Sequence, residues 1–140
     1  VFSSIAKVRG SELIISVHAV KIKTKEDLDL GGTIVDFQID NDLIPTHIKL
    51  LGDHQIDNAR TAIATIYQLS SAGIKTVNSK TANGINKVEW PARNQLVATS
   101  PIKIFVDGAH NDASAKVLKS SIEKFFPFNL LITFGNSLNS

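Results

Sequence analysis

Residues 101–108 read Pro-Ile-Lys-Ile-Phe-Val-Asp-Gly, and this stretch gives the clearest indication of fold class. Ile102 to Val106 form a short run between a proline and an Asp-Gly turn, which is typical of a strand buried on both faces. Residues 111–126 follow with a helical pattern that Pro127 ends, and residues 129–134 have the composition of a second buried strand. Strand, helix and strand in this order predict a right-handed βαβ unit, the opening of a doubly wound α/β sheet.

The first part of the chain is predicted to alternate between strands and turns. β-branched residues at 11–22 indicate two short strands with a break at His18-Ala19, and residues 23–29 form a charged connector. Further strands are expected at 33–39 and 48–51, separated by Asp, Asn and Pro residues that favour turns. This part therefore contributes β-structure upstream of the βαβ unit.

A helix is predicted over 54–71, because apolar side chains recur there at spacings of three and four. Asp53 is its expected N-cap and Gly73 its expected stop signal. A short helix is expected from Ser79 to Gly84 and a short strand over 95–98. The Trp-Pro-Ala-Arg sequence between them should interrupt regular structure, since proline cannot donate to a β-ladder.

The composition is that of an ordinary globular protein, and it argues against several classes of function. Hydrophobic residues make up 43% of the 140 and charged residues 20%, which is enough apolar material for a buried core. The formal net charge is only +2 and the basic residues are dispersed, so nucleic acid is not an expected partner. No apolar run approaches the roughly 20 residues that span a bilayer, so no membrane partner is expected. The chain lacks Met and cannot fill two average domains, so we expect a fragment of a longer protein.

Cysteine is absent and histidine is sparse, which bears on metal and redox chemistry. Without Cys there is no disulfide framework, thiolate metal site or thiol nucleophile, which fits a reducing, cytoplasmic location. The histidines show no ligand spacing, so no metal site is predicted in this chain; they are His18, His47, His54 and His110.

The Asp-Gly-Ala-His-Asn sequence after the Ile102–Val106 strand is the first candidate for ligand binding. Ligands of open α/β sheets bind beyond the carboxyl ends of the strands. Asp107 can accept hydrogen bonds from both vicinal hydroxyls of a ribose, and Gly108 lets a ligand approach the backbone closely. The alternative is that Asp107 only caps the following helix while His110 lies in solvent.

Two further places carry groups suited to a nucleotide. His54 and Asn58 share one polar helix face, and the Asn58 amide offers the donor and acceptor that match an adenine edge. A solvated or interdomain polar face explains that pair equally well. Arg93 follows Trp90-Pro91 and could clamp phosphate oxygens, although most single arginines form only weak surface pairs. The sequence contains no phosphate-binding Gly-x-x-x-x-Gly-Lys-Ser/Thr loop.

Three short segments, taken together, are similar to one known family. They are Leu51-Gly52-Asp53-His54-Gln55-Ile56-Asp57-Asn58-Ala59, Val88-Glu89-Trp90-Pro91-Ala92-Arg93 and Val106-Asp107-Gly108-Ala109-His110-Asn111. In this order they resemble the folylpolyglutamate synthase and dihydrofolate synthase branch of the Mur ligase superfamily, and Phe134-Gly135 is similar to the family's next strand. The resemblance implies an α/β fold in which residues 1–98 are the C-terminal portion of a central ATP-binding domain. Residues 99–140 would then start a Rossmann-like C-terminal domain.

The resemblance also implies roles in nucleotide binding for four residues, none of them catalytic. Asn58 resembles the residue that contacts the adenine, and Arg93 the residue that reaches the ATP phosphates. Asp107 resembles the carboxylate that holds the ribose, and His110 the histidine beside the nucleotide.

Two positions depart from the family pattern. Ala92 stands where the family usually has Gly, which can narrow the approach to the phosphates. Asp112 stands where the family usually has Pro, and an acidic residue in the first turn of a helix should have little effect.

The activity that the resemblance implies is ATP-dependent amide ligation. ATP and Mg²⁺ would activate the carboxylate of dihydropteroate or a tetrahydrofolate as an acyl phosphate, and L-glutamate would then attack it. The family's phosphate-binding loop, Mg²⁺ ligands and most of its pterin site would precede this chain, so the chain alone should be inactive and the full-length enzyme monomeric. Two alternatives stay open, a fragment of a peptidoglycan Mur ligase and a non-catalytic nucleotide-binding or interaction module.

Overall fold

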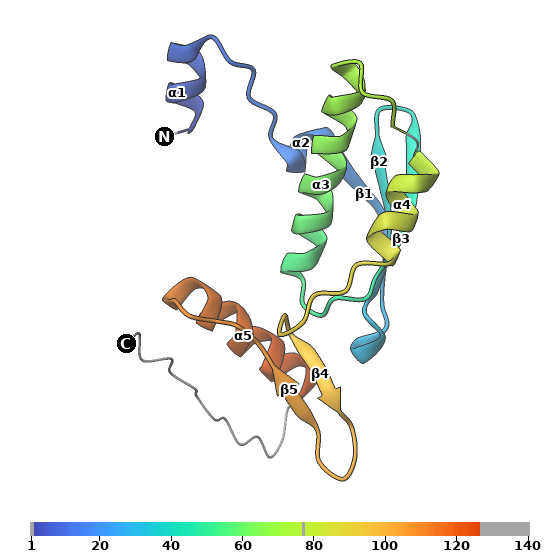
Figure 1. The fold of residues 1–140 in the computed structure, drawn as a ribbon, viewed down its shortest axis with the longest axis vertical. Helices are drawn as coiled ribbons and strands as arrows, with labels where there is room; N and C mark the ends of the chain where they lie inside the picture. Colours follow the sequence, from blue (N-terminus) through green and yellow to red (C-terminus); the bar gives the residue numbers. More distant parts are fainter. Residues whose placement is uncertain (1, 77, 127–140) are drawn as a thin grey trace.

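The computed structural model describes residues 2–76 and 78–126, and Figure 1 shows their arrangement. The elements in chain order are α1 (Phe2–Arg9), α2 (Ser16–Ala19), β1 (Val20–Asp27), the 3₁₀ helix η1 (Asp29–Gly31), β2 (Thr33–Ile39), β3 (Asp42–Ile48), α3 (His54–Ser71), α4 (Asn78–Asn86), β4 (Gln95–Ala98), β5 (Ile104–Val106) and α5 (Asp112–Phe125). The strand expected at 129–134, the stop at Pro127 and the Phe134-Gly135 segment lie outside the described residues.

Strands β1, β2 and β3 form an antiparallel meander in that order. Val20 at the start of β1 pairs with Ile39 at the end of β2. The residues of β2 alternate between buried and more exposed positions, as a strand with one covered face requires. The covered face carries the core, in which Val35 and Phe37 are fully buried.

Helix α3 packs its apolar side against this face of the sheet, and its observed bounds are those that the sequence predicts. Its last turn closes in a Schellman motif, in which the backbone N–H of Gly73 donates to Ser70 and that of Ile74 donates to Leu69. Gly73 has a φ of +88°, which an L side chain rarely adopts. The prediction of Gly73 as the stop signal is therefore confirmed.

Helix α4 covers the free edge of β3. The side-chain oxygen of Asn86 accepts a 2.7 Å hydrogen bond from the backbone N–H of His47, an edge group that has no strand partner on that side. Ala82 joins the core from the same helix. The expected stop at Gly84 is wrong, because the helix continues through this exposed position to Asn86, whose contact with β3 holds the last turn.

The chain after Trp90 forms a hairpin and a helix. β4 and β5 pair in antiparallel fashion, with Gln95 opposite Val106. Helix α5 begins at a capping box, in which Asn111 Oδ1 accepts a 2.9 Å hydrogen bond from the backbone N–H of Ser114. The predictions of a short strand at 95–98 and of a helix after Asn111 are confirmed.

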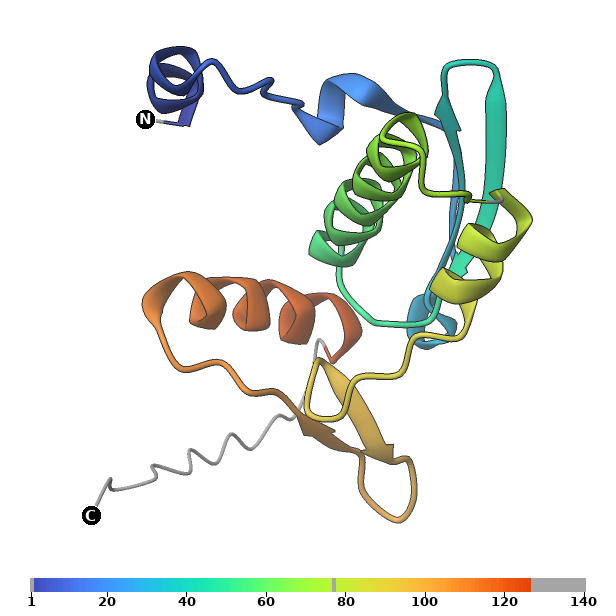
Figure 2. The same cartoon turned by 45° about the horizontal axis from the view of Figure 1, so that its top comes forward.

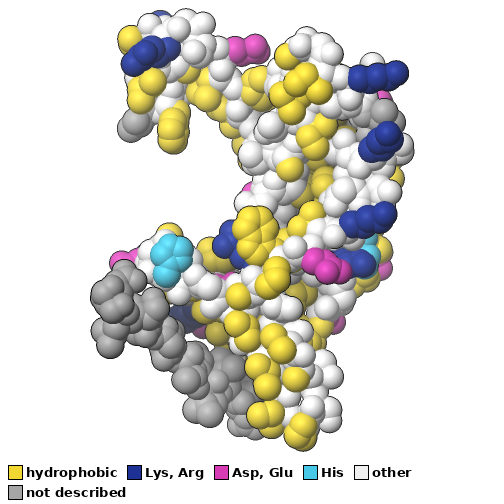
Figure 3. Space-filling model, in the orientation of Figure 1, with side chains coloured by type: hydrophobic (Ala, Val, Ile, Leu, Met, Phe, Trp, Pro, Cys, Tyr) yellow, Lys and Arg dark blue, Asp and Glu magenta, His cyan; other side chains and the backbone are white. Residues whose placement is uncertain are grey.

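The strand expected at 102–106 is shorter and less covered than predicted. β5 begins at Ile104, and its side chains are exposed, half-buried and exposed in turn. Apolar side chains gather over the hairpin in Figure 3. Val97 and Ile102 are among the exposed hydrophobic residues of this part of the chain. Burial on both faces is wrong for the described residues, because an antiparallel hairpin that pairs along one edge leaves its faces open.

The first fifty residues contain further errors of prediction. Residues 11–15 have no regular structure and the next four form α2, so the strand expected there is wrong. β1 runs through most of the expected 23–29 connector, because pairing with β2 satisfies its backbone while charged side chains remain in solvent on this edge strand. β3 covers 42–48 and not 48–51, since Asp40 takes a φ of +47° and lets the turn close in two residues.

Helix α1 stands apart from both the meander and the hairpin, as the two views in Figures 1 and 2 show, and it buries none of its residues. Among the helices of residues 2–76 and 78–126, none is both long enough and apolar enough to cross a lipid bilayer.

Candidate functional site

A pocket of about 390 Å³ lies where the end of β3, the start of α3, the end of α4 and the Trp90–Arg93 loop meet. This volume is within the range of small-molecule sites. Its walls are mostly apolar, with two amide side chains, one lysine and one arginine. The lining residues are Ile48, Lys49, Leu50, Gln55, Asn58, Ala59, Ala62, Ile85, Val88, Trp90 and Arg93.

The two amides on the α3 wall form a connected chain of hydrogen bonds. Asn58 Nδ2 donates to Gln55 Oε1 at 3.0 Å, and Gln55 Nε2 lies 3.0 Å from His54 Nε2. Gln55 is only 4% exposed, so it holds the Asn58 amide firmly on the pocket wall. The buried Gln55 did not stand out in the sequence, although its place in the His-Gln-x-x-Asn segment was a signal for it.

Trp90 and Arg93 form the opposite wall. The guanidinium carbon of Arg93 lies 5.8 Å from the centroid of the Trp90 ring, within the range of a cation–π contact. Trp90 is 63% exposed and thus presents a large aromatic surface at the pocket, with a positive charge beside it. The sequence predicted an irregular segment here, and that prediction is confirmed.

Asp107 does not line this pocket, but hydrogen bonds tie it to the pocket wall. Its Oδ2 accepts a 2.8 Å hydrogen bond from the backbone N–H of Asn94, the residue after Arg93. The next residue, Gly108, donates its backbone N–H to the carbonyl of Ala92 at 2.8 Å. The loop after β5 and the loop after Trp90 are therefore joined at two points.

His110 stays within its own loop. Its Nδ1 lies 3.1 Å from the carbonyl of Gly108, its Nε2 lies 3.5 Å from the Asn111 amide, and the residue is exposed. Helix α5 is capped by Asn111, so the alternative in which Asp107 caps this helix is wrong.

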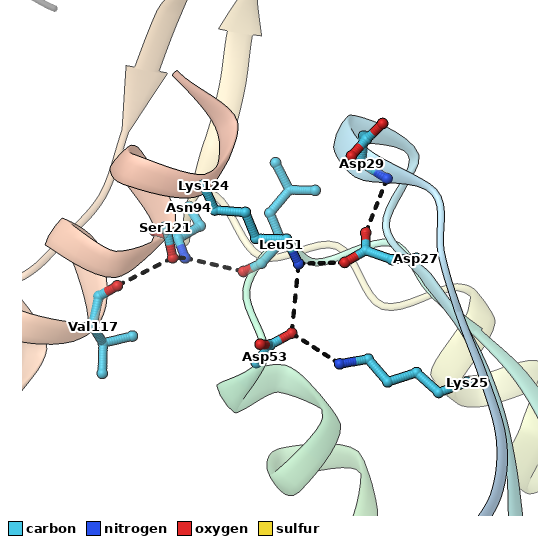
Figure 4. A network of polar contacts seen from close by, with 9 residues as sticks. All are labelled: Lys25, Asp27, Asp29, Leu51, Asp53, Asn94, Val117, Ser121 and Lys124. Carbon is cyan, nitrogen blue, oxygen red and sulfur yellow. Dashed lines mark hydrogen bonds and ion pairs between the residues drawn. The ribbon is translucent and has the colours of Figure 1, made fainter. Parts of the chain in front are cut away.

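The expected N-cap of α3 has a different role. Asp53 occupies the N-cap position as predicted, but it has helical backbone angles and its side chain makes no capping hydrogen bond. Its carboxylate lies 3.2 Å from Lys25 Nζ and 3.6 Å from Lys124 Nζ, and these cations compete with the helix N–H groups for it. Asp53 thus belongs to the ion pairs between the meander and α5 that Figure 4 shows.

His54 lies between the charged groups of this region. Burial lowers the pKa of His54 below 6.5, and the positive charge of Arg93 lowers it further, against the opposing effect of the Asp107 carboxylate. Both charges therefore act on the same imidazole. The neutral imidazole is the favoured form here.

No protein-family model matches the chain. The chain is 34% identical over 92 residues to a protein of Halobacterium salinarum named probable bifunctional folylpolyglutamate synthase/dihydropteroate synthase. This match covers 66% of the chain and 11% of that protein. It is 27% identical over 111 residues to the dihydrofolate synthase/folylpolyglutamate synthase of Mycobacterium tuberculosis, with 77% of the chain and 23% of that protein covered. The dihydrofolate synthetase of Saccharomyces cerevisiae is 26% identical over 94% of the chain and 32% of its own length.

Solved structures of folylpolyglutamate synthases share the fold. The synthetase from Lactobacillus casei matches with a TM-score of 0.74 and 21% identity over 89% of this chain and 32% of that chain. A structure described as an FPGS-AMPPCP-folate complex matches with a TM-score of 0.78 and 21% identity over 89% and 30%. The enzyme from Thermotoga maritima matches with a TM-score of 0.68 and 23% identity over 89% and 29%.

These matches confirm the resemblance that the three motifs indicated and the mixed α/β fold class. The chain spans only 11% to 32% of the curated relatives, so it is similar to one segment of folylpolyglutamate and dihydrofolate synthases.

Proposed function

We propose that this chain forms the adenosine side of the ATP site in a ligase that joins L-glutamate to dihydropteroate, to folates or to both. The observation that supports this most is the mostly apolar pocket that Asn58 and Arg93 both line, together with the hydrogen bond that joins Asn94, the residue after Arg93, to Asp107. The similarity to glutamate ligases of folates and to a complex with the ATP analogue AMPPCP supports the same proposal.

In this proposal the base occupies the pocket beside α3. An adenine is a flat ring with donors and acceptors on its edge, so it requires apolar walls and one amide of the Asn58 kind. The exposed Trp90 ring offers a face on which a base can stack. The bond from Asn58 to Gln55 would fix the orientation of the amide before the base arrives.

The ribose and phosphates would lie toward the loop after β5. The Asp107 carboxylate has a second oxygen besides the one bonded to Asn94, and vicinal hydroxyls are good donors to it. Arg93 would supply positive charge to the phosphates, and a bidentate guanidinium suits their oxygens. His110, exposed on the same loop, would lie beside the nucleotide.

The reaction of such a ligase proceeds in two transfers. The carboxylate of dihydropteroate or of a folate attacks the γ-phosphorus of ATP and releases ADP, and the glutamate amine then displaces phosphate from the acyl phosphate. Mg²⁺ would neutralise phosphate charge in the first transfer. Within residues 2–76 and 78–126, no three acidic or histidine side chains gather to hold a metal ion, so we assign Mg²⁺ ligation to none of them.

We also propose that residues 1–98 and 99–140 belong to two domains of a cytoplasmic, monomeric enzyme, with the nucleotide between them. β4, which precedes this boundary, pairs with β5, which follows it, so the hairpin would connect the two domains.

A ligation assay on the complete protein that carries this chain tests the proposal. It would contain ATP, Mg²⁺, L-glutamate and, in separate reactions, dihydropteroate and tetrahydrofolate. We expect a glutamyl amide product with one of them, and a lower rate for Arg93→Ala at unchanged unfolding temperature. Lys103→Ala is the matched control, because this exposed cation lies outside the pocket lining. Absence of ATP-dependent product with either pterin would contradict the proposal.

A further inference from the structure

Asn94 is a buried side chain at the junction of three segments. It is 2% exposed, and its Nδ2 donates to the carbonyl of Leu51 at 3.0 Å and to Ser121 Oγ at 2.8 Å. Leu51 precedes α3, and Ser121 lies in the second half of α5. One amide therefore joins the part that contains the meander and α3 to the part that contains the hairpin and α5 (Figure 4). Ser121 Oγ in turn donates to the carbonyl of Val117, which fixes it as the acceptor for Asn94.

The backbone of the same residue holds Asp107. The N–H of Asn94 donates to Asp107 Oδ2 at 2.8 Å while its φ is +44°. Asn adopts this left-handed conformation more readily than most L residues do. Side chain and backbone of one residue therefore connect Asp107 to both the start of α3 and the second half of α5.

There is little free space around this amide. A Cβ added at Gly52 would lie 2.9 Å from Asn94 Nδ2 and 2.7 Å from Cε1 of His54. Gly52 itself has a φ of +104°, so a side chain there is disfavoured both by the backbone conformation and by the lack of space. The amide thus packs directly against the backbone that leads into α3.

We propose that Asn94 is a positioning residue for nucleotide binding, whose side chain sets the distance between Asp107 and the α3 wall so that a base and its ribose are held together. This inference rests on the proposed function. It goes beyond that function because Asn94 does not line the pocket and would contact neither the base nor the ribose. Arg93, next to it in the chain, would contact the phosphates directly, whereas Asn94 would act only by holding Asp107 in place.

The junction has a second, independent tie, so removing the amide should not separate the two parts. Lys124 of α5 pairs with Asp27 at the end of β1 and lies 3.6 Å from Asp53 at the start of α3 (Figure 4). Variants of Asn94 are therefore expected to fold with the same elements.

The test measures the affinity of the complete protein for ATP and for 2′,3′-dideoxy-ATP, which lacks the ribose hydroxyls. Asn94→Gly keeps the left-handed backbone and removes the amide. We expect it to weaken ATP binding about tenfold and dideoxy-ATP binding by about twofold or less, because only ATP uses Asp107. Combined with Asp107→Ala, it should add little further loss for ATP.

Two other variants complete the test. Ser121→Ala removes one partner of the amide, and we expect a smaller loss with the same preference for ATP over dideoxy-ATP; it decides the question if Asn94→Gly does not fold. The inference is overturned if Asn94→Gly leaves ATP affinity unchanged, weakens both nucleotides equally, or is additive with Asp107→Ala. Failure of the unsubstituted protein to bind ATP, or of Asp107→Ala to weaken it, would instead refute the proposed function and remove the basis of the inference.

Discussion

The backbone carbonyl of Ala92 accepts a 2.8 Å hydrogen bond from the backbone N–H of Gly108, which joins the loop after Trp90 to the loop after β5. Ala92 makes this contact with a φ of +55°, in the left-handed region. An L side chain is disfavoured there by roughly 1–2 kcal/mol relative to glycine. The family's usual glycine at this position thus has a conformational reason in this chain.

Ala92→Gly should raise the free energy of unfolding by about 1 kcal/mol, since it removes this strain and keeps the hydrogen bond to Gly108. Urea denaturation of the 140-residue chain measures the change. Ala115→Gly in the exposed side of α5 is the matched control and should lower the free energy of unfolding by about 1 kcal/mol. A loss of stability in both variants would contradict the strain at Ala92.

Asn58→Ala should weaken ATP binding to the complete protein about tenfold, because the base loses its only hydrogen-bonding side chain in the proposed pose. Isothermal titration calorimetry gives the dissociation constants. Asn83→Ala, on the exposed side of α4 and outside the pocket lining, is the control and should leave the affinity unchanged. Equal ATP affinities of the Asn58→Ala and Asn83→Ala variants would show that Asn58 does not bind the base.

The ion pair between Lys124 and Asp27 should stabilise the junction at neutral pH. The hydrogen bond from Lys124 lowers the pKa of Asp27 below its ordinary 3.8, so the stabilisation is present above that value and is lost as the pH falls through the lower, folded-state pKa. A double-mutant cycle with Asp27→Asn and Lys124→Met should give a coupling of up to about 1 kcal/mol at pH 7 and none in strong acid.

The exposed pair between Lys119 and Glu123, one turn apart on α5 at 3.7 Å, is the comparison for that cycle. It should give about 0.5 kcal/mol or less, and high salt should weaken it more. A coupling for Lys124 and Asp27 that does not exceed this value would show that the pair does not hold the junction.

His54 should titrate below pH 6.5. Its folded-state pKa is lowered chiefly by burial and then by Arg93, so the unfolded chain takes up a proton first as the pH falls. Stability should therefore be full above pH 6.5 and decrease from there down to the folded-state pKa. An NMR titration of the imidazole measures this directly. Arg93→Ala should move the pKa back upward, and a pKa of His54 at or above 6.5 would contradict the described surroundings.

Local patterns predicted α3, α5 and the central strand well, whereas α1 and α2 were not predicted. The apolar spacing over 54–71 gave α3 its bounds, and Thr33–Ile39 became β2, because each has one face against the core. The start of β1 at Val20 was predicted, but its continuation to Asp27 was missed, since its burial is confined to Val20 and its pairing with β2 is not visible in its own composition. Pairing partners distant in sequence decide such edge strands.

The candidate site could be predicted only in part. The motif residues Asn58 and Arg93 line one pocket. Asp107 does not line it, but accepts a hydrogen bond from Asn94, the residue after Arg93. Asn94 gave no signal in the sequence, because its importance comes from contacts with Leu51 and Ser121, which are distant from it in the chain. A buried amide of this kind is recognisable only once the two parts are seen together.

The most direct test is a crystal structure of the complete protein with AMPPCP. It should hold the adenine between Asn58 and Trp90, with the ribose hydroxyls on Asp107 and the phosphates toward Arg93. A nucleotide bound at some other place, with this pocket and Asp107 left free, would contradict the assignment of the chain to the adenosine side of an ATP site.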